Sequence, residues 1–191
     1  MTDFSDANNQ SLKLTSQSDK INAILKSLES ELKFNQVEIT ELKKPLTIEF
    51  YEKWLSLNYN GEMEYLSNHL NYKQNPSLIS NFSKNKSKQF NSVVCIAQSY
   101  TQTDVKKIEH PARLALYAQT EDYHFWLKEK LSDAVSRLKI QFPDEEFMPF
   151  VDSGPILERD WSYQSGLGWF GKNTCVISRK HGSLFFLAEI F

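Results

Sequence analysis

The chain has 191 residues, a formal net charge of −2, 40% hydrophobic residues and 24% charged residues. This length is typical of a single domain, and the hydrophobic fraction is enough for a sizeable core. The balanced charge argues against a generally basic nucleic-acid-binding protein, although it leaves room for a local basic patch. No apolar run approaches the ~20 residues of a membrane span, and the N-terminus lacks a signal-peptide pattern. We therefore expect a cytoplasmic protein without membrane contact.

The N-terminal half is expected to begin with a disordered or weakly ordered arm over residues 1–17, because this segment is rich in Ser, Asn, Gln and Asp. Ser18 has the character of a helix N-cap, and apolar residues from 21 to 32 follow at helical spacing. The elements expected next are a strand at 36–40, a helix opened by Pro45, a short helical stretch at 61–66 and a loop over 71–92.

The C-terminal half alternates further strands and helices. The expected elements are a buried strand at 93–97, a helix over about 122–142, a strand at 147–151, a helix from Pro155 to Gly166, and two strands over 175–191. This alternation predicts an α/β (α+β) domain over residues 18–191, built as a layered sheet flanked by helices. Because the apolar strand at 184–191 has no polar residues after it, we expect this domain to be incomplete at its C-terminus.

Cysteine and histidine spacing offers no metal site. The two cysteines, Cys95 and Cys175, lie in separate apolar runs without a CxxC pattern, and the four histidines have no zinc-ligand spacing. Two thiolates also cannot supply the four ligands of an iron–sulfur cluster. The sequence therefore predicts buried thiols and no metal ligands.

A glycine-rich segment carries the most distinctive local pattern, Gly166-Leu-Gly168-Trp-Phe-Gly171-Lys172-Asn173. A nucleotide phosphate loop needs a strand before the glycines and a helix after them, and here the expected order is reversed. Asn173 also lacks the hydroxyl group that would hold Mg²⁺. The open alternatives are a turn that only ends a helix, or a glycine floor that lets a flat ligand approach the backbone.

Asp152 follows an expected strand and precedes an expected helix, and two roles suit a carboxylate there. It can cap the helix by accepting hydrogen bonds from backbone N–H groups. It can instead face a cleft as a proton donor, provided that burial raises its pKa. The residues alone leave both roles open.

Several segments resemble, in collinear order over about residues 20–191, the epoxyqueuosine reductase family. Residues 151–159 resemble its VDTGPxLER segment, 166–174 its GLGWxGKNT loop and 182–190 its GSWFFLGEI strand. Upstream, 61–66 are similar to its GEMxYL segment and 115–124 to its ARYAxGxDYH segment. Lys73 and Asn75 stand where the family often has Arg and Asp.

The resemblance implies a cobalamin-dependent oxidoreductase that reduces epoxyqueuosine to queuosine at the wobble position of the tRNA anticodon loop. Electrons would come from an external donor through two [4Fe–4S] clusters in a following segment, which this chain does not ligate. The N-terminal region would build much of the cobalamin cleft, on a fold similar to cobalamin-processing and nitroreductase-like proteins. The implied partners are tRNA and the electron donor, and the implied state is a monomer.

The resemblance also assigns site residues position by position. Asp152 matches the proton donor, which favours its catalytic role, and Tyr123 and His124 match substrate-binding positions. The positions that match cobalamin-binding ones are Lys73, Ala115, Gly171, Lys172, Asn173, Val176, Leu187 and Ile190. Two alternatives are a non-catalytic cobalamin-binding or trafficking module of the same fold, and a phosphate-loop nucleotide-binding protein, which the reversed strand–helix order disfavours.

Overall fold

The computed structural model describes residues 4–83, 88–100, 115–119 and 121–191, with side chains described from residue 17 onward. The helices are α1 (Phe4–Glu31), α2 (Ile48–Ser56), α3 (Leu70–Gln74), α4 (Tyr123–Gln141) and α5 (Glu158–Gln164). The strands are β1 (Gln36–Glu41), β2 (Ser92–Ser99), β3 (Pro149–Phe150), β4 (Trp169–Phe170), β5 (Val176–Ile177) and β6 (Phe185–Ile190). Short 3-10 helices are η1 (Glu64–Leu66), η2 (Pro76–Phe82) and η3 (Leu116–Gln119).

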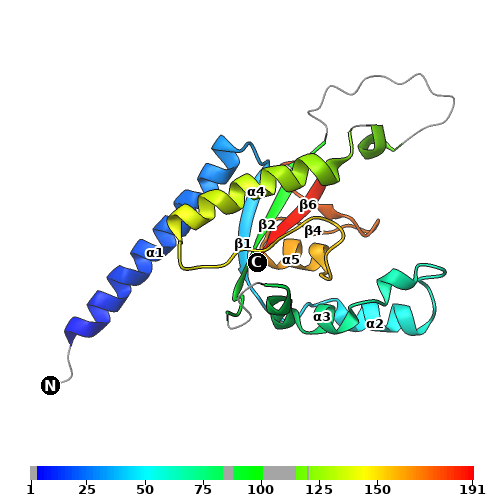
Figure 1. The fold of residues 1–191 in the computed structure, drawn as a ribbon, viewed down its shortest axis with the longest axis horizontal. Coiled ribbons are helices and arrows are strands. Elements are labelled where there is room, and N and C mark those ends of the chain that lie inside the picture. The colour runs from blue at the N-terminus through cyan, green and yellow to red at the C-terminus, as the bar shows by residue number, and fades with distance from the viewer. Residues whose placement is uncertain (1–3, 84–87, 101–114, 120) are drawn as a thin grey trace.

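The architecture centres on a four-stranded sheet with the strand order β1-β2-β6-β3 (Figure 1). Each of its three strand pairs is antiparallel. The strands β4 and β5 form a separate antiparallel hairpin that contacts α5. The expected layered sheet flanked by helices is therefore confirmed as a mixed α/β fold.

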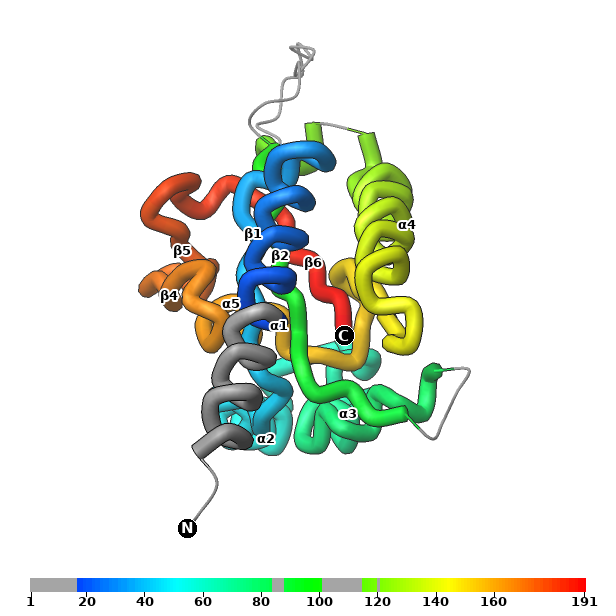
Figure 2. Tube along the Cα trace, turned by 90° about the vertical axis from the view of Figure 1, so that its left-hand side faces the viewer, coloured from blue at the N-terminus to red at the C-terminus, as the bar shows by residue number. Residues whose placement is uncertain are grey.

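The central strands β2 and β6 send alternate side chains into two hydrophobic cores, one on each face of the sheet. On one face, Val94 and Ile96 pack with side chains of α1 and α4. On the other face, Cys95 packs in the same cluster as Trp161 of α5. Figure 2 shows this division, with α1 and α4 on one side of the sheet and α5 with the hairpin on the other. Both central strands are therefore covered on both faces, as the apolar run at 93–97 predicts.

The structure corrects two expectations in the N-terminal half. The first helix begins at Phe4 rather than after Ser18, so the segment expected as an arm lies within α1 from that residue on. Residues 1–3 of the expected arm lie outside the described residues. The segment expected as a loop at 71–92 contains the last residues of α3 and all of η2, which begins with Pro76 at a position suited to proline.

Two further corrections concern the C-terminal half. The helix expected from Pro155 begins only at Glu158, because residues 152–156 form a run of bends. The segment at 176–177 pairs with β4 and not with β6. A Cβ atom at Gly168 would lie 2.4 Å from the carbonyl oxygen of Ile177, so only a glycine allows the two backbones of this hairpin to approach so closely.

Asp160 joins α5 to the start of α2. Its buried carboxylate accepts hydrogen bonds from the backbone N–H groups of Leu46 and Thr47, both at 2.8 Å, and from the Thr47 hydroxyl group. Gln164 donates a further hydrogen bond to it at 3.1 Å. Because Thr47 makes no side-chain cap of its own, Asp160 supplies the acceptor that the N-terminus of α2 requires. This contact fixes α2 against the sheet layer.

The helix α4 offers a test of the core. We expect Leu131→Ala to lower the free energy of unfolding by about 2–5 kcal/mol, because Leu131 is fully buried between α4 and the sheet and its loss leaves a cavity. Ile140→Ala on the same helix is the matched control, since Ile140 is 77% exposed, and it should change stability by less than about 0.5 kcal/mol. Urea unfolding of both variants measures the difference, and equal losses would contradict this packing.

Candidate functional site

A cavity of about 1000 Å³ lies between the α2–α3 layer and the bends that precede α5. One wall is rich in aromatic side chains, namely Phe50, Tyr51, Trp54 and Tyr65. The other wall is formed by residues 152–160 and by the β4–β5 connection at Gly171 and Thr174. Ligand sites are typically of this size and combine apolar walls with a few polar groups.

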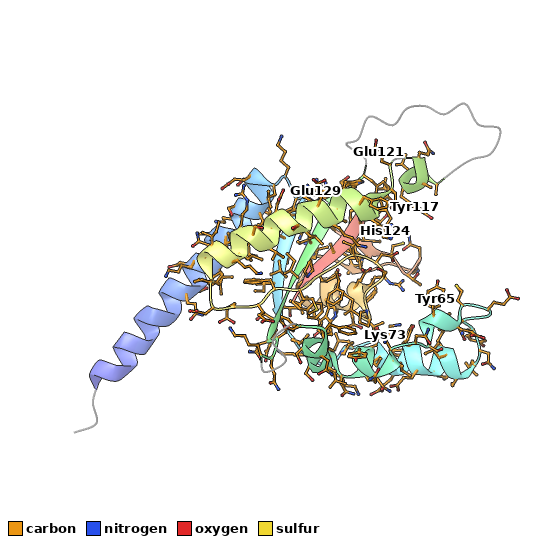
Figure 3. The ribbon with its side chains drawn as sticks, in the orientation of Figure 1. Tyr65, Lys73, Tyr117, Glu121, His124 and Glu129 are labelled. Carbon is orange, nitrogen blue, oxygen red and sulfur yellow. The ribbon has the colours of Figure 1, made fainter. Side chains whose placement is uncertain are left out.

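Lys73 supplies a cation to this cavity. Its side chain is mostly buried, and its Nζ donates hydrogen bonds to the Tyr51 hydroxyl oxygen at 2.8 Å and to the Leu66 carbonyl oxygen at 3.1 Å. Burial lowers the pKa of Lys73 and raises the pKa of Tyr51. Figure 3 shows Lys73 and Tyr65 in the α2–α3 layer and His124 at the start of α4. Lys73 is therefore a hydrogen-bond donor and cation suited to an oxygen-rich ligand.

Asp152 lies at the edge of the cavity in a strained turn. Its φ angle is +54°, which is unusual for a residue with a side chain, and the Ser153 N–H donates to the Val151 carbonyl oxygen across it at 2.6 Å. A hydrogen bond over three residues with a positive φ at the centre has the pattern of the rare γ-turn. Backbone strain of this kind is concentrated at functional sites.

The helix-capping role left open for Asp152 is not observed, because the N-cap of α5 is Leu157 and no side chain caps this helix. The Asp152 side chain is instead 60% exposed and lies 3.1 Å from Nε2 of His124. It therefore does not have the desolvated surroundings expected for a proton donor in this chain alone.

His124 connects Asp152 to a second carboxylate. Asp122 is the N-cap of α4, and its Oδ1 accepts from the His124 backbone N–H at 2.9 Å and lies 2.7 Å from His124 Nδ1. Hydrogen bonding to Asp122, and to a lesser extent to Asp152, raises the pKa of His124. The hydrogen bond from the His124 backbone N–H, and then that from its ring, lower the pKa of Asp122. The imidazole ring is thus held between two carboxylates that favour its protonated form.

Tyr123 completes this group. Its ring stacks on the ring of His124, with centroids 4.1 Å apart, and on Phe186 of β6, with centroids 3.9 Å apart. Burial, and then the nearby charge of Asp152, raises the pKa of Tyr123. The structure therefore brings together three residues that the sequence singled out: Asp152, Tyr123 and His124.

Beneath Asp152 lie two glutamates that the sequence interpretation missed. Glu158 lines the cavity and has one carboxyl oxygen buried without a hydrogen-bond partner, and burial raises the pKa of Glu158 to about 7, helped by the nearby charge of Asp152. Glu189 is fully buried in β6, and burial raises the pKa of Glu189 well above its ordinary value. The sequence held one signal for Glu189, namely that it is an acidic residue within an otherwise apolar expected strand.

The other expected cofactor residues are dispersed. Gly171 lines the cavity, whereas Lys172 and Asn173 are exposed on the hairpin beside it, and Asn173 Oδ1 accepts from the Cys175 N–H at 3.2 Å. The remaining four residues do not line the cavity. Ala115 is exposed, Leu187 is half-buried, and Val176 and Ile190 are buried. Ile190 packs in the core with α1 and α4.

Two features are absent from the described residues. No helix in this part of the chain combines the length and apolar character that a bilayer crossing requires. Nor do three or more His, Cys, Asp or Glu side chains gather there in a group that could hold a metal ion.

Known proteins with similar sequences share one description. Residues 83–153 match the family model "Epoxyqueuosine reductase QueG, DUF1730". An epoxyqueuosine reductase from Cyclobacterium marinum is 37% identical over 140 residues, which cover 73% of this chain and 43% of the relative. The chain thus spans less than half the length of this curated relative.

Two solved structures share the fold. The epoxyqueuosine reductase of Streptococcus thermophilus superposes with a TM-score of 0.63 at 20% identity, over 90% of this chain and 45% of that one. An epoxyqueuosine reductase with an epoxyqueuosine-modified tRNA-Tyr stem loop superposes with a TM-score of 0.59, also at 20% identity, over 93% of this chain and 45% of that one.

The fold and site thus define a mixed α/β protein with an acidic group at the edge of a large, partly aromatic cavity. The chain belongs to the epoxyqueuosine reductase family, whose members are oxidoreductases of queuosine and tRNA modification that use cobalamin and iron–sulfur clusters.

Half-buried Glu158 and fully buried Glu189 predict a pH dependence of stability. An unfolded glutamate has a pKa near 4.5, and in the folded state the value is about 7 for Glu158 and well above 4.5 for Glu189. The folded state therefore binds these protons more tightly, so their stabilising contribution is full below about pH 4.5 and falls as the pH rises above it, and that of Glu158 is lost as the pH rises through about 7. Urea unfolding between about pH 5 and 8 should show this fall, and Glu189→Gln should flatten its upper part. Stability that rises over this range in the wild type would contradict the expectation.

Proposed function

We propose that this chain forms the cobalamin-binding, proton-donating part of an epoxyqueuosine reductase. The observation that carries the proposal is the convergence of Asp152, Tyr123 and His124 at one end of the cavity, although Asp152 is separated from the other two by about 30 residues of sequence. We infer that the fold is related to that of cobalamin-processing and nitroreductase-like proteins. Such a fold suits this function. The substrate would be cytoplasmic tRNA.

The reaction fixes what the residues must do. Reduction of an epoxide to an alkene takes up two electrons and two protons and releases the oxygen as water. Opening of the ring leaves negative charge on this oxygen, and a positioned acid that donates a proton to it accelerates such a step. Bound cobalamin would supply the electrons. Asp152 would supply a proton from its carboxyl group at the cavity edge.

His124 and Tyr123 would position that acid. The imidazole Nε2 lies 3.1 Å from the Asp152 carboxyl group, the Tyr123 ring stacks on the imidazole ring, and Asp122 holds the other ring nitrogen. Because Asp122 favours protonated His124, the pair carries a proton that can pass from Nε2 to the Asp152 oxygen after donation.

The cavity residues fit a large ring with polar amide edges. Lys73 would donate from Nζ to amide or phosphate oxygens of cobalamin, and the backbone at Gly171 would approach its face. Lys172 and Asn173 are exposed on the same hairpin, where they would meet the periphery of the ring. The aromatic wall would exclude water from one side of the cavity.

A non-catalytic cobalamin-binding module of the same fold is the second candidate. It would use Lys73 and the glycine hairpin in the same way but would need no acid. The strained turn at Asp152 favours the enzyme, because a binding module gains nothing from holding a carboxyl group in an unfavourable backbone conformation.

Ligand binding by the purified chain tests the cavity. We expect cob(II)alamin to change its visible spectrum on titration with the chain, and Mg-ATP to bind much more weakly. Lys73→Met should weaken cob(II)alamin binding by about 10-fold, the usual effect of losing a buried hydrogen bond from a charged group. Lys53→Met, on the exposed side of α2, is the matched control. Tight ATP binding with no spectral change would refute the proposal.

Turnover tests Asp152 in a chimera in which this chain replaces the matching part of the Cyclobacterium marinum enzyme. We expect Asp152→Asn to lower turnover by about 10²–10⁴-fold with cob(II)alamin binding almost unchanged, because it removes the transferable proton but keeps the shape. Asp144→Asn, exposed in the loop after α4, is the control. Wild-type turnover in Asp152→Asn would remove this residue from the mechanism and favour the binding module.

A further inference from the structure

Asp160 is a buried carboxylate that belongs to one wall of the cavity and binds the other. It lines the cavity from α5, and only 1% of its surface is exposed. Each carboxylate oxygen takes one backbone N–H group at the start of α2, since Oδ1 accepts from Leu46 and Oδ2 accepts from Thr47, both at 2.8 Å. The Thr47 hydroxyl group also donates to Oδ2. Asp160 therefore ties the α2–α3 layer to the wall that carries Asp152.

Other contacts between α2 and the sheet layer are weak. Within this helix only Ile48 is buried, and it lies outside both hydrophobic cores. Close backbone contacts between α2 and the other described helices and strands are sparse. Hydrogen bonds in which one group is ionised are roughly twice as strong as those between neutral groups. We therefore expect the Asp160 carboxylate to contribute much of what holds α2 in place.

The helix α2 in turn carries the residue that holds the amine of Lys73. Tyr51 lies one turn after Thr47, and its backbone N–H donates to the Thr47 carbonyl oxygen at 3.0 Å. The Tyr51 hydroxyl group accepts from Lys73 Nζ at 2.8 Å and donates to the Leu66 carbonyl oxygen at 2.5 Å. Nζ also lies over the Tyr51 ring, 4.7 Å from its centroid. A continuous series of contacts thus runs from Asp160 through the first turn of α2 to Lys73.

We propose that Asp160 is a positioning residue that fixes the place of the Lys73 amine in the cavity by holding α2. The inference rests on the proposed function, in which Lys73 binds an oxygen atom of cobalamin. If α2 moved away from α5, Tyr51 would move with it and Lys73 would lose its fixed partner. An amine that is already held in place loses less conformational freedom when a ligand binds, so the ligand binds more tightly.

Three variants separate this role from the others that Asp160 could have. Asp160→Asn keeps the shape but replaces one carboxylate oxygen by an NH₂ group, which then faces a backbone N–H group of α2. Thr47→Val removes only the hydroxyl donor and leaves both backbone hydrogen bonds. Gln164→Met is the matched control, because Gln164 donates to Asp160 at 3.1 Å from within α5 and does not touch α2.

Acetylation of lysines in the chain, with no cofactor present, tests the position of Lys73. We expect sulfo-NHS-acetate to modify Lys73 slowly in the wild type, since its amine is hydrogen-bonded and the residue is only 7% exposed. Asp160→Asn should speed this reaction about 10-fold relative to exposed Lys53, and Thr47→Val about 3-fold, as measured by peptide mass spectrometry. Gln164→Met should leave the rate unchanged. Leu131→Ala, which weakens the core far from α2, should also leave it unchanged while the chain stays folded.

Titration with cob(II)alamin supplies the second measurement. We expect Asp160→Asn to weaken binding by about 10-fold, as Lys73→Met does. The double variant should bind no more weakly than Lys73→Met alone, because Asp160 acts through Lys73. A general loss of stability would instead lower the affinity by the same factor in both backgrounds, so the effects of the two substitutions would multiply.

The two measurements have separate failures. Wild-type acetylation of Lys73 in both Asp160→Asn and Thr47→Val, or binding losses that multiply in the double variant, would overturn the inference. Should Asp160→Asn fail to fold, Thr47→Val alone decides it by the same acetylation rate. If the wild-type chain bound no cob(II)alamin, the proposed function would fall, whereas the acetylation rates would still decide whether Asp160 positions Lys73.

Discussion

The burial of β6 on both of its faces is the constraint on which the site depends. This strand lies between β2 and β3, and its alternate side chains enter opposite cores. Phe186 points to the α4 side, where it stacks on Tyr123, and Glu189 is fully buried on the α5 side. A single strand register therefore positions the aromatic support of the acid site and the buried acid beneath it. A shift by one residue would exchange the two faces and lose both.

Asp160 and Glu189 both carry buried carboxyl groups, and the hydrogen-bond donors around each group determine its role. Asp160 receives four hydrogen bonds, from Leu46, from Thr47 twice and from Gln164, so its carboxylate is fully supplied with donors and joins two helices. Glu189 has none among the described residues. A buried carboxylate with its donors is a structural link, whereas a buried carboxyl group without them is kept neutral and can hold a proton.

The sequence predicted best those elements whose pattern is local and strong. The apolar run at 93–97 and the helical spacing over 122–142 both correspond to elements of the structure, as β2 and α4. The polar segment around α3 gave no periodic signal, and the proline at 155 suggested a helix start where tertiary contacts impose bends. The position of Asp152 between an expected strand and an expected helix drew attention to it, and family resemblance then assigned roles to Asp152, Tyr123 and His124. Glu158 and Glu189 were not, because their meaning comes from burial and from contacts between residues distant in sequence.

The conformation of the turn at Asp152 reflects a balance between backbone strain and the contacts of its side chain. Val151 and Ile156 are buried at either end of the loop and anchor it between β3 and α5. A positive φ at Asp152 costs about 1–3 kcal/mol. The ion pair between Asp152 and His124, whose side chains are 60% and 34% exposed, contributes about 0.2–1 kcal/mol against that cost. This contact therefore offsets only part of the strain in the turn. Deprotonation of His124 weakens one side of that balance, which couples the conformation of the loop to the protonation state of the group that holds it.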